Sequence, residues 1–398
     1  MFMKKVSLLF IIIMSCCLNR ICFSDWSGEV GLETRYFTQS AFTPQQDYRA
    51  NVSLYMQPEY VREWDDGHQV FAFVPFLRID QHDSERSHFD VRELTWLKAS
   101  ENWELRLGVR KVFWGVIEFN HLVDIINQTD LVENVDGEDK LGQPMVNLAL
   151  IRDWGTIDLF VMPWFRERTF PGTHGRFRSQ PVVADDMAKY ESPAGQHHVD
   201  FAIRYSHYFG DWDIGISDFY GTSREPELIP DFSGPTPVLV PYYSIINQAS
   251  LDLQVTKGQM LYKLEALHRS GQDKTFNAMA AGFEYTFTRI FDTESDLGIL
   301  GEYHYDSRGD SAPTIFNHDF AIGSRVTLND ENSSTILIGL LIDKNNGGKF
   351  FNLESSRRFG NNWLLKLQAR IPFDQIPADP AFAISRDDFL EMEFSYNF

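Results

Sequence analysis

The chain reads Trp103-Glu104-Leu105-Arg106-Leu107-Gly108-Val109-Arg110 at its most regular point. Every odd position in this stretch is apolar, and every even position is polar or Gly. Successive side chains of a β-strand point to opposite faces, so the stretch predicts a strand with one apolar and one wet face. The wet face carries full charges, which are costly to bury in a dry protein interior.

The same period of two recurs along the whole chain, for example in Val199–Tyr205 and in Trp363–Ile371. So many half-polar strands indicate an all-β protein, a transmembrane antiparallel up-and-down β-barrel. About eighteen strands are predicted, with bounds uncertain by a few residues. They are 28–38, 48–62, 69–79, 88–98, 103–110, 144–152, 156–163, 198–208, 212–219, 245–255, 260–267, 276–288, 297–305, 317–328, 335–342, 350–357, 363–371 and 389–398.

The connections between these strands alternate between short turns and longer segments. Asp65-Asp66-Gly67, Gly210-Asp211 and Gly360-Asn361-Asn362 are examples of the short turns. The longer segments lie near 110–143, 164–197, 220–244 and 372–388. Bacterial outer-membrane barrels alternate short periplasmic turns with long external loops, and starting and ending on one side requires an even number of strands.

The last strand ends on an aromatic residue at the C-terminus. Its apolar positions, from Leu390 to Phe398, alternate with Glu391, Glu393, Ser395 and Asn397. This strand must pair with the first, because an open edge in lipid leaves backbone groups unsatisfied. The pattern resembles the C-terminal signature by which the barrel-assembly machinery recognises outer-membrane proteins. The assembly signal implied by that resemblance is Phe394, Tyr396 and Phe398.

The N-terminus predicts a signal peptide over residues 1–24, followed by the barrel over 25–398. Lys4 and Lys5 precede an apolar run of about thirteen residues, shorter than the roughly twenty that a transmembrane helix needs. Cys22 and Ser24 fit a cleavage site, and lipidation at Cys16 is the alternative. All three cysteines fall in this segment, so no disulfide or Cys-based site is expected in the mature chain.

The composition supports a membrane barrel and argues against nucleic-acid binding. The 398 residues carry 36 Lys and Arg against 56 Asp and Glu, a formal charge of −20, whereas binding phosphates requires a basic patch. Aromatic residues make up 14% of the chain although its mean hydropathy is −0.28. Lipid-facing aromatic girdles combined with a polar lumen account for both values.

In the predicted register, the inward positions carry charges of both signs. An eighteen-stranded barrel is too wide for side chains to fill, so we interpret these groups as walls of an aqueous channel. Salt-bridge ladders that stiffen the wall are the alternative for each of them. The predicted pore-lining residues are Arg78, Glu104, Arg106, Arg110, Asp158, Asp200, Arg204, Lys263, Glu265, Glu302, Arg325, Lys366 and Arg370.

The overall plan resembles Gram-negative porins across the mature chain. Arg110–Gly115, Asp124–Asp130 and Gly142–Pro144 also look like porin-like outer-membrane proteins of proteobacteria without an assigned substrate. General trimeric porins usually have sixteen strands, and their constriction motifs are absent here. In porins the third external loop folds into the lumen, so the resemblance implies that the loop 111–143 forms a constriction.

The sequence of this loop fits a buried position, because it is rich in apolar residues such as Trp114, Ile125 and Ile126. A surplus of carboxylates at a narrow point favours cations. Arginines on the opposite wall would instead create a transverse field that selects dipolar solutes. The predicted constriction residues are Glu118, Asp124, Asp130, Glu133, Asp136, Glu138 and Asp139.

No metal site or cofactor is expected. Residues 134–139 lack the spaced ligands of a calcium loop and indicate a tight acidic turn. His197 and His198 are adjacent on a strand and point to opposite faces, so they do not chelate together. The arginines of loop 164–197 could bridge lipopolysaccharide phosphates or attract anionic solutes, and a solvated loop is the alternative.

These observations predict a porin-like channel of the cell outer membrane for passive diffusion of small hydrophilic solutes. A substrate-specific channel, for a sugar, an organic acid or an acidic polysaccharide, is the main alternative. An outer-membrane enzyme is disfavoured because no nucleophile with a neighbouring base stands out, and a plugged structural or adhesive barrel is a further alternative. The expected partners are outer-membrane lipid and lipopolysaccharide, the barrel-assembly machinery and small hydrophilic solutes, with no nucleic acid and a possible homo-oligomer.

Overall fold

The computed structural model describes residues 26–377 and 379–398. The predicted signal segment 1–24 lies outside the described residues. Among those residues, no helix is long and apolar enough to cross a bilayer. The helical turns present are short 3-10 segments: Pro44–Gln46, Asp185–Met187, Gly195–His197, Ile290–Asp292, Gly309–Ser311 and Pro380–Ile384.

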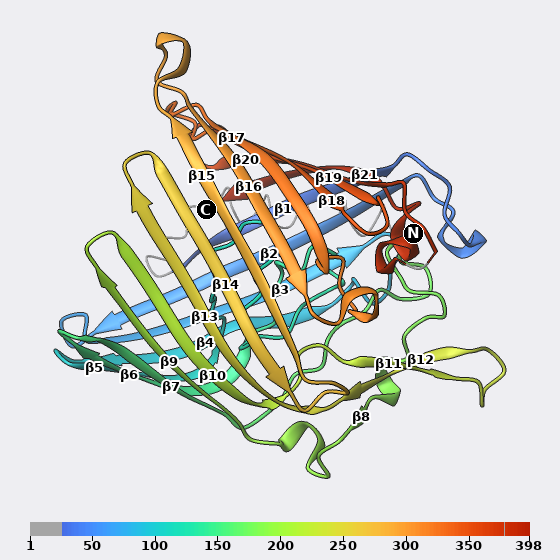
Figure 1. Cartoon of the computed structure of the whole chain (residues 1–398), viewed down its shortest axis with the longest axis horizontal. Helices are drawn as coiled ribbons and strands as arrows, with labels where there is room; N and C mark the ends of the chain where they lie inside the picture. The colour runs from blue at the N-terminus through green and yellow to red at the C-terminus, as the bar shows by residue number, and fades with distance from the viewer. Residues whose placement is uncertain (1–25, 378) are drawn as a thin grey trace.

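Eighteen strands form one antiparallel sheet in which each strand pairs with its neighbours along the chain (Figure 1). The predicted fold class and strand count are confirmed, and each predicted bound lies within three residues of the observed one. The strands are β1 (Trp26–Phe37), β2 (Ala50–Trp64), β3 (Gln69–Asp80), β4 (Phe89–Ala99), β5 (Trp103–Arg110), β6 (Gln143–Arg152), β7 (Gly155–Met162), β9 (Asp200–Phe209), β10 (Trp212–Thr222), β13 (Ile245–Lys257), β14 (Met260–Ser270), β15 (Phe276–Phe287), β16 (Asp296–Asp306), β17 (His318–Thr327), β18 (Thr335–Asp343), β19 (Lys349–Phe359), β20 (Trp363–Phe373) and β21 (Phe389–Asn397).

The first and last strands close the cylinder. β1 pairs antiparallel with β21 from Glu29↔Asn397 to Phe37↔Phe389. Beyond this ladder, the backbone groups of Gly28 and Phe398 exchange hydrogen bonds of 3.0 and 3.2 Å. The barrel therefore has no free edge, as a strand fold in lipid requires.

The two faces of the sheet differ sharply in polarity. On β9, Phe201 and Ile203 point outward and are 49% and 45% exposed, whereas Asp200 points inward and is fully buried. The outward positions of the last strands are also apolar: Phe394 stacks on Trp363 with ring centroids 4.7 Å apart. An apolar exterior around a charged interior is stable only where lipid covers the outside.

Most short turns lie at one end of the barrel, and the longest loops lie at the other (Figure 1). Four loops matter below: L2 (81–88), L3 (111–142), L4 (163–199) and L5 (223–244). No strands were predicted in L4 and L5, but these loops carry a small sheet of β8 (Lys189–Tyr190), β11 (Glu227–Asp231) and β12 (Val238–Tyr243). These strands lie outside the barrel wall, so the alternation between lipid and lumen does not mark them.

Candidate functional site

L3 folds into the barrel, as expected. Val123 and Ile126 are completely buried against Met145, Phe160 and Phe219 of the inner wall. Burying an aliphatic or aromatic side chain of this size contributes about 1.5–3 kcal/mol. The apolar content of the loop thus fixes its first half on the wall formed by β6, β7 and β10.

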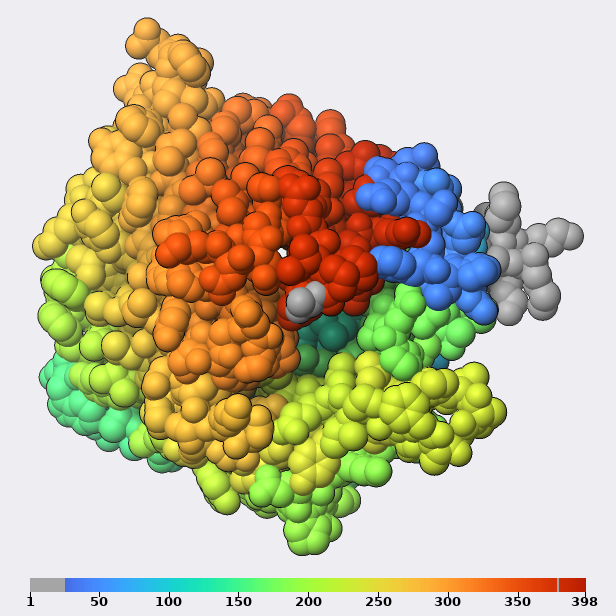
Figure 2. Space-filling model, turned by 45° about the vertical axis from the view of Figure 1, so that its right-hand side comes forward, coloured from blue at the N-terminus to red at the C-terminus, as the bar shows by residue number. Residues whose placement is uncertain are grey.

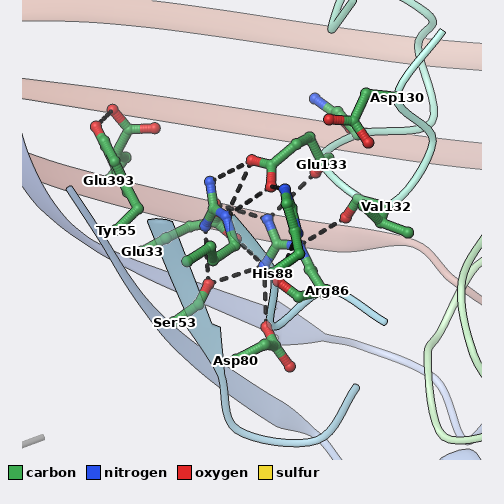
Figure 3. A network of polar contacts seen from close by, with 12 residues as sticks. Glu33, Ser53, Tyr55, Asp80, Arg86, His88, Asp130, Val132, Glu133 and Glu393 are labelled. Carbon is green, nitrogen blue, oxygen red and sulfur yellow. Dashed lines mark hydrogen bonds and ion pairs between the residues drawn. The ribbon is translucent and has the colours of Figure 1, made fainter. Parts of the chain in front are cut away.

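The second half of L3 is held by charge. The guanidinium of Arg78 on β3 binds the Glu133 carboxylate of L3, with Nη2 and Oε2 2.6 Å apart and Nε 2.9–3.0 Å from both oxygens. Figure 3 shows Glu133 in a network of polar contacts that also contains Glu33 and Arg86. Both side chains are about 6% exposed. Paired arginine–carboxylate bonds of this kind are strong and geometrically specific.

Other groups of the wall complete this cluster, which we call the arginine cluster. Arg86 of L2 donates to the backbone oxygen of Val132 at 2.8 Å and to that of Glu133 at 3.2 Å. Glu33 of β1 lies between the guanidinium groups and accepts from both Arg78 and Arg86 at 2.8–2.9 Å. The members of the cluster are Glu33, Arg35, Arg78, Arg86, Arg92 and Glu133.

The cluster keeps Glu133 ionised. Burial alone would raise the pKa of this carboxyl, but Arg78, Arg86 and Arg92 together hold the pKa below its ordinary value. The ionic attachment of L3 therefore persists at neutral pH.

A second attachment lies on the opposite wall and has a different chemistry. The carboxylate of Glu265 on β14 accepts the backbone N–H groups of Val116, Ile117 and Val123 at 2.6, 2.9 and 3.1 Å. Glu302 on β16 accepts the N–H groups of the next two L3 residues, 118 and 119, at 2.8 and 3.1 Å. Two wall carboxylates thus bind the loop backbone, and we call them the wall carboxylates.

Beside the wall carboxylates, Phe119 of L3 rests over two glycines of the inner wall. A Cβ atom on Gly339 would lie 2.5 Å from the Phe119 ring, and one on Gly323 would lie 3.3 Å from it. The absence of side chains at these two positions lets the loop approach β17 and β18 closely.

A third contact secures the middle of L3. Arg224 of L5 donates to the backbone oxygen of Ile126 at 3.0 Å and pairs with Asp200 of β9 at 2.6 Å. L3 is therefore attached to the walls at both ends and in between, and it crosses the lumen.

The space left beside L3 is polar. A cavity of about 510 Å³ lies between L3 and the strands β17 to β21, with β1 and β3 at its side. A second cavity of about 190 Å³ adjoins it and shares Glu118, Asp136, Glu138 and Glu354. We call the region of these four shared carboxylates the passage. The loop end of the barrel is hollowed between the orange and red segments and the green ones, with teal chain at the floor (Figure 2).

Negative groups outnumber positive ones around the larger cavity. Its lining includes nine carboxylates and four cationic side chains. The carboxylates are Glu33, Glu118, Glu133, Asp136, Glu138, Asp139, Glu354, Glu391 and Glu393, and the cationic residues are Arg35, Arg78, Arg325 and Lys366. A surplus of this sign attracts cations.

One L3 carboxyl titrates near neutrality. Burial raises the pKa of Asp139 to about 7, and the neighbouring Glu133 and Asp136 carboxylates raise it further than Arg92 lowers it. The negative charge of the lining therefore changes between mildly acidic and mildly basic pH.

The structure brings some of the predicted pore-lining residues to these cavities and places others elsewhere. Arg325 and Lys263 pair with Glu118 at 2.6 and 3.6 Å. Arg370 pairs with Asp136 at 3.1 Å. Arg78, Arg325 and Lys366 line the larger cavity, and Arg370 lines the smaller one.

The remaining predicted residues differ from the expectation of a free wet wall. Asp200, Glu265 and Glu302 are at most 5% exposed, because loops cover them. The others form pairs along the inner wall: Glu104 with Arg106, Arg110 and Asp158 with Asn147, and Arg204 with Asp252.

The predicted constriction acids divide in the same way. Glu118, Glu133, Asp136, Glu138 and Asp139 line the larger cavity. Asp130 faces the wall instead and pairs with Arg92 at 2.6 Å, and Asp124 lies 3.5 Å from Lys140.

Sequence reasoning missed four members of the arginine cluster. Glu33 and Arg35 follow the alternation of β1, so the sequence period could have predicted their inward positions. Arg92 lies where the register of β3 and β4 shifts between Val74 and Pro75, and such a bulge re-aims a side chain. Arg86 lies in a loop, where no periodicity exists.

Two groups in the described residues have the spacing of metal ligands, namely His88, Asp130 and Glu133, and Glu33, Glu391 and Glu393. Arginines already neutralise carboxylates of both groups: Arg92 pairs with Asp130, and Arg35 with Glu33 and Glu391. Neither group therefore requires a cation.

The other groups that were weighed as ligand sites from the sequence make local contacts. His197 packs on Trp164, whereas His198 contacts Asp200. Asp136 accepts from Asn134 and from the backbone of Glu138, as in a tight turn. In L4, Arg176 pairs with Asp387 and Arg166 with Asp90, which ties the loop to the barrel.

No protein-family model and no curated protein sequence matches this chain. Wzi of Escherichia coli, an outer-membrane protein involved in group 1 capsule assembly and described as a carbohydrate-binding β-barrel, is similar in structure. The TM-score is 0.54 at 10% identity, covering 93% of this chain and 84% of Wzi. A mutant porin of Rhodopseudomonas blastica matches at 9% identity over 94% of this chain and 99% of the porin, with a TM-score of 0.44 that is too low to inform about the fold.

The likeness to Wzi extends to the fold alone at this identity. The resemblance predicted from the sequence is confirmed at that level: the chain has the fold of a closed eighteen-stranded antiparallel β-barrel, which it shares with outer-membrane barrels such as Wzi.

Proposed function

We propose that this protein is a non-catalytic channel of the Gram-negative outer membrane that passes small hydrophilic solutes and prefers cations. The apolar exterior supports a place in lipid, and the short turns at the end that carries Trp26 and Phe398 support the outer-membrane topology. The signal segment expected over residues 1–24 agrees with export.

One observation carries the proposal: L3 crosses the lumen but leaves the polar passage beside β18 and β19. Glu118, Asp136, Glu138 and Glu354 meet there. Arg325 and Lys263 pair with Glu118, Arg370 lies between Asp136 and Glu354, and His121 contacts Glu138, so the four carboxylates outnumber the three Lys and Arg side chains beside them. Solutes that enter this narrow space lose part of their hydration, and carboxylates replace it best for cations.

Planar-bilayer recordings test this proposal. The folded protein should conduct, and in a tenfold KCl gradient the reversal potential should have the sign of cation preference. Glu138→Gln combined with Glu354→Gln should reduce that preference. Glu104→Gln is the matched control, because Glu104 pairs with Arg106 on β5 and does not line the cavities. Anion preference of the wild type would contradict the proposal.

A carbohydrate-binding barrel is the second candidate. The larger cavity has a volume typical of small-ligand sites, and its carboxylates and arginines could bond sugar hydroxyls. The fold similarity to a carbohydrate-binding barrel adds to this candidate. A folded, heat-modifiable preparation that binds oligosaccharides but shows no conductance would favour it over the channel.

A further inference from the structure

A groove of about 1000 Å³ runs over the lipid-facing side of the strands β14 to β19. Three of these strands, β14, β15 and β16, lie side by side in Figure 1. The lining is almost entirely apolar, and its outward side chains Phe320 and Ile322 are 47% and 55% exposed. The volume lies at the upper end of the range for ligand sites. The barrel exterior therefore has a hollow large enough for a bound molecule.

The groove follows one row of residues across six strands. Each residue of the row is the direct partner of the next one on the neighbouring strand: Tyr262, Phe283, Gly301, Ile322, Leu340 and Phe351. Neighbouring strands are roughly 4.8 Å apart, so the row is about 24 Å long. In its middle, Gly301 has no side chain, and a Cβ atom there would lie 3.0 Å from the Phe283 ring. A long apolar groove of this kind fits a hydrocarbon chain rather than a compact polar solute.

The end of the groove nearest the long loops adjoins two basic side chains. Lys344 directly follows β18, and its Nζ lies 3.4 Å from Nε2 of His318 at the start of β17. The His318 ring contacts Tyr303 and Tyr305 on β16, with ring centroids 5.7 and 6.4 Å apart. Tyr303 itself lines the groove. We call Lys344 and His318 the basic pair.

The basic pair has no acidic partner. Neither Lys344 nor the His318 ring forms an ion pair with a carboxylate among the described residues, and Lys344 is exposed. The nearby exposed acid Asp374 is already paired with Lys349 at 2.6 Å. Basic side chains at the edge of a membrane attract anionic lipid head groups.

An apolar groove that ends at a basic pair is complementary to an anionic amphiphile. Hydrocarbon chains would cover the groove, and a phosphate would accept hydrogen bonds from Lys344 and His318. The long loops face outward in the topology proposed above, where the outer leaflet consists of lipopolysaccharide, whose lipid A part carries phosphates and several acyl chains. The arginines of L4 are not available for this role, because Arg176 and Arg166 pair with acids of the barrel.

We propose that the groove over β14 to β19 binds acyl chains of one lipopolysaccharide molecule, and that the basic pair binds a phosphate of its lipid A. The proposal rests on the outer-membrane location given under the proposed function. It does not depend on conductance, so it can fail while the channel proposal stands.

Native mass spectrometry of the full barrel tests the proposal, in detergent and after removal of lipopolysaccharide. The barrel is titrated with lipid A, with dephosphorylated lipid A and with phosphatidylglycerol. One lipid A molecule should bind per barrel and raise the melting temperature by several degrees. The other two lipids should bind about tenfold more weakly, because one lacks the phosphates and the other has fewer acyl chains.

Two variants separate the parts of the site. Lys344→Glu should weaken the binding of lipid A about tenfold and leave that of the dephosphorylated form unchanged. Ile322→Trp fills the groove and should weaken both. The matched controls are Lys257→Glu, an exposed lysine at the opposite end of the barrel, and Ile216→Trp, a lipid-facing position on β10 that is 50% exposed. Both controls should bind lipid A as the wild type does.

The wild-type comparison decides the proposal even where a variant fails to fold. Phosphatidylglycerol that binds as tightly as lipid A would overturn the assignment to lipopolysaccharide. Equal binding of lipid A and its dephosphorylated form would overturn the role of the basic pair. Lipid A binding that Ile322→Trp leaves unchanged would place the lipid elsewhere on the barrel.

Discussion

The two ends of L3 are attached to the barrel in opposite ways. At the arginine cluster, a side chain of the loop, Glu133, binds guanidinium groups of the wall. At the wall carboxylates, Glu265 and Glu302 bind backbone N–H groups of the loop. The first attachment requires a particular side chain in the loop, Glu133. The second requires only the conformation of the loop backbone and the two carboxylates of the wall.

This difference has a consequence for selectivity. The wall carboxylates bind the loop backbone, so Glu138, whose side chain contacts His121 of the same loop, can vary with the solute without releasing the loop. Glu133 has no such freedom, because its replacement removes one of the two carboxylates that pair with the buried Arg78. We therefore expect substitutions at the two ends of L3 to have effects that differ in size and in kind.

The largest effect is expected for Glu133→Ala. Removing one partner of a buried ion pair costs about 3–5 kcal/mol, because the remaining charge stays buried. The second half of L3 should leave the wall, and single-channel conductance should rise and become noisier. Glu104→Ala is the control, since Glu104 pairs with Arg106 on β5 and lines neither cavity. A Glu133→Ala channel indistinguishable from wild type would show that the arginine cluster does not hold L3.

A smaller effect is expected for Glu265→Gln. The amide keeps one acceptor oxygen but turns an N–H₂ group toward a loop N–H, and hydrogen bonds to charged groups contribute about 1.5–3 kcal/mol. Amide hydrogen exchange of residues 116–123 should accelerate while that of residues 130–135 stays unchanged. If Glu265→Gln and Glu133→Ala changed hydrogen exchange in the same residues, the two attachments would not be independent of each other. Glu104→Gln is the matched control on the inner wall.

Filling the glycine surface under Phe119 should have a lesser effect. The new side chain of Gly339→Val would overlap the Phe119 ring, and overpacking costs about 1 kcal/mol or somewhat more. We expect Phe119 to move into the passage and lower the conductance, while the ion pairs of the arginine cluster stay intact. Ile338→Val, on the lipid-facing side of the same strand, should leave the conductance unchanged.

The smallest effect is expected for Asp139→Asn, which alters charge without altering attachment. Because the pKa of Asp139 is raised to about 7, this carboxyl is neutral well below that pH and ionised above it. Wild-type cation preference should therefore increase between pH 6 and pH 8, and reversal potentials should show a flatter response in the variant. An equally steep response in Asp139→Asn would assign the titration to another group.

The sequence alone predicted one attachment better than the other. Glu265 and Glu302 follow the strand alternation, and so their inward position was predictable. Their burial was not, because periodicity distinguishes the lumen from lipid but does not tell water from a loop that fills the lumen. The resemblance to porins supplied the inward fold of L3.

The arginine cluster escaped prediction for physical reasons. Arg86 comes from a loop whose path depends on tertiary contacts, and Arg92 lies beside a bulge that breaks the period.

The central claim is that solutes pass between L3 and the inner face of β18 and β19. A chain expressed from residue 25 has no cysteine, so single cysteines can be placed at will. Glu354→Cys lies in the passage, and Leu353→Cys lies one residue away on the lipid-facing side, opposite Ile338. Conductance would be recorded in planar bilayers before and after a bulky, charged thiol reagent. We predict that the reagent blocks most of the current through Glu354→Cys channels and none through Leu353→Cys channels; unchanged current through Glu354→Cys channels after complete modification would contradict the account.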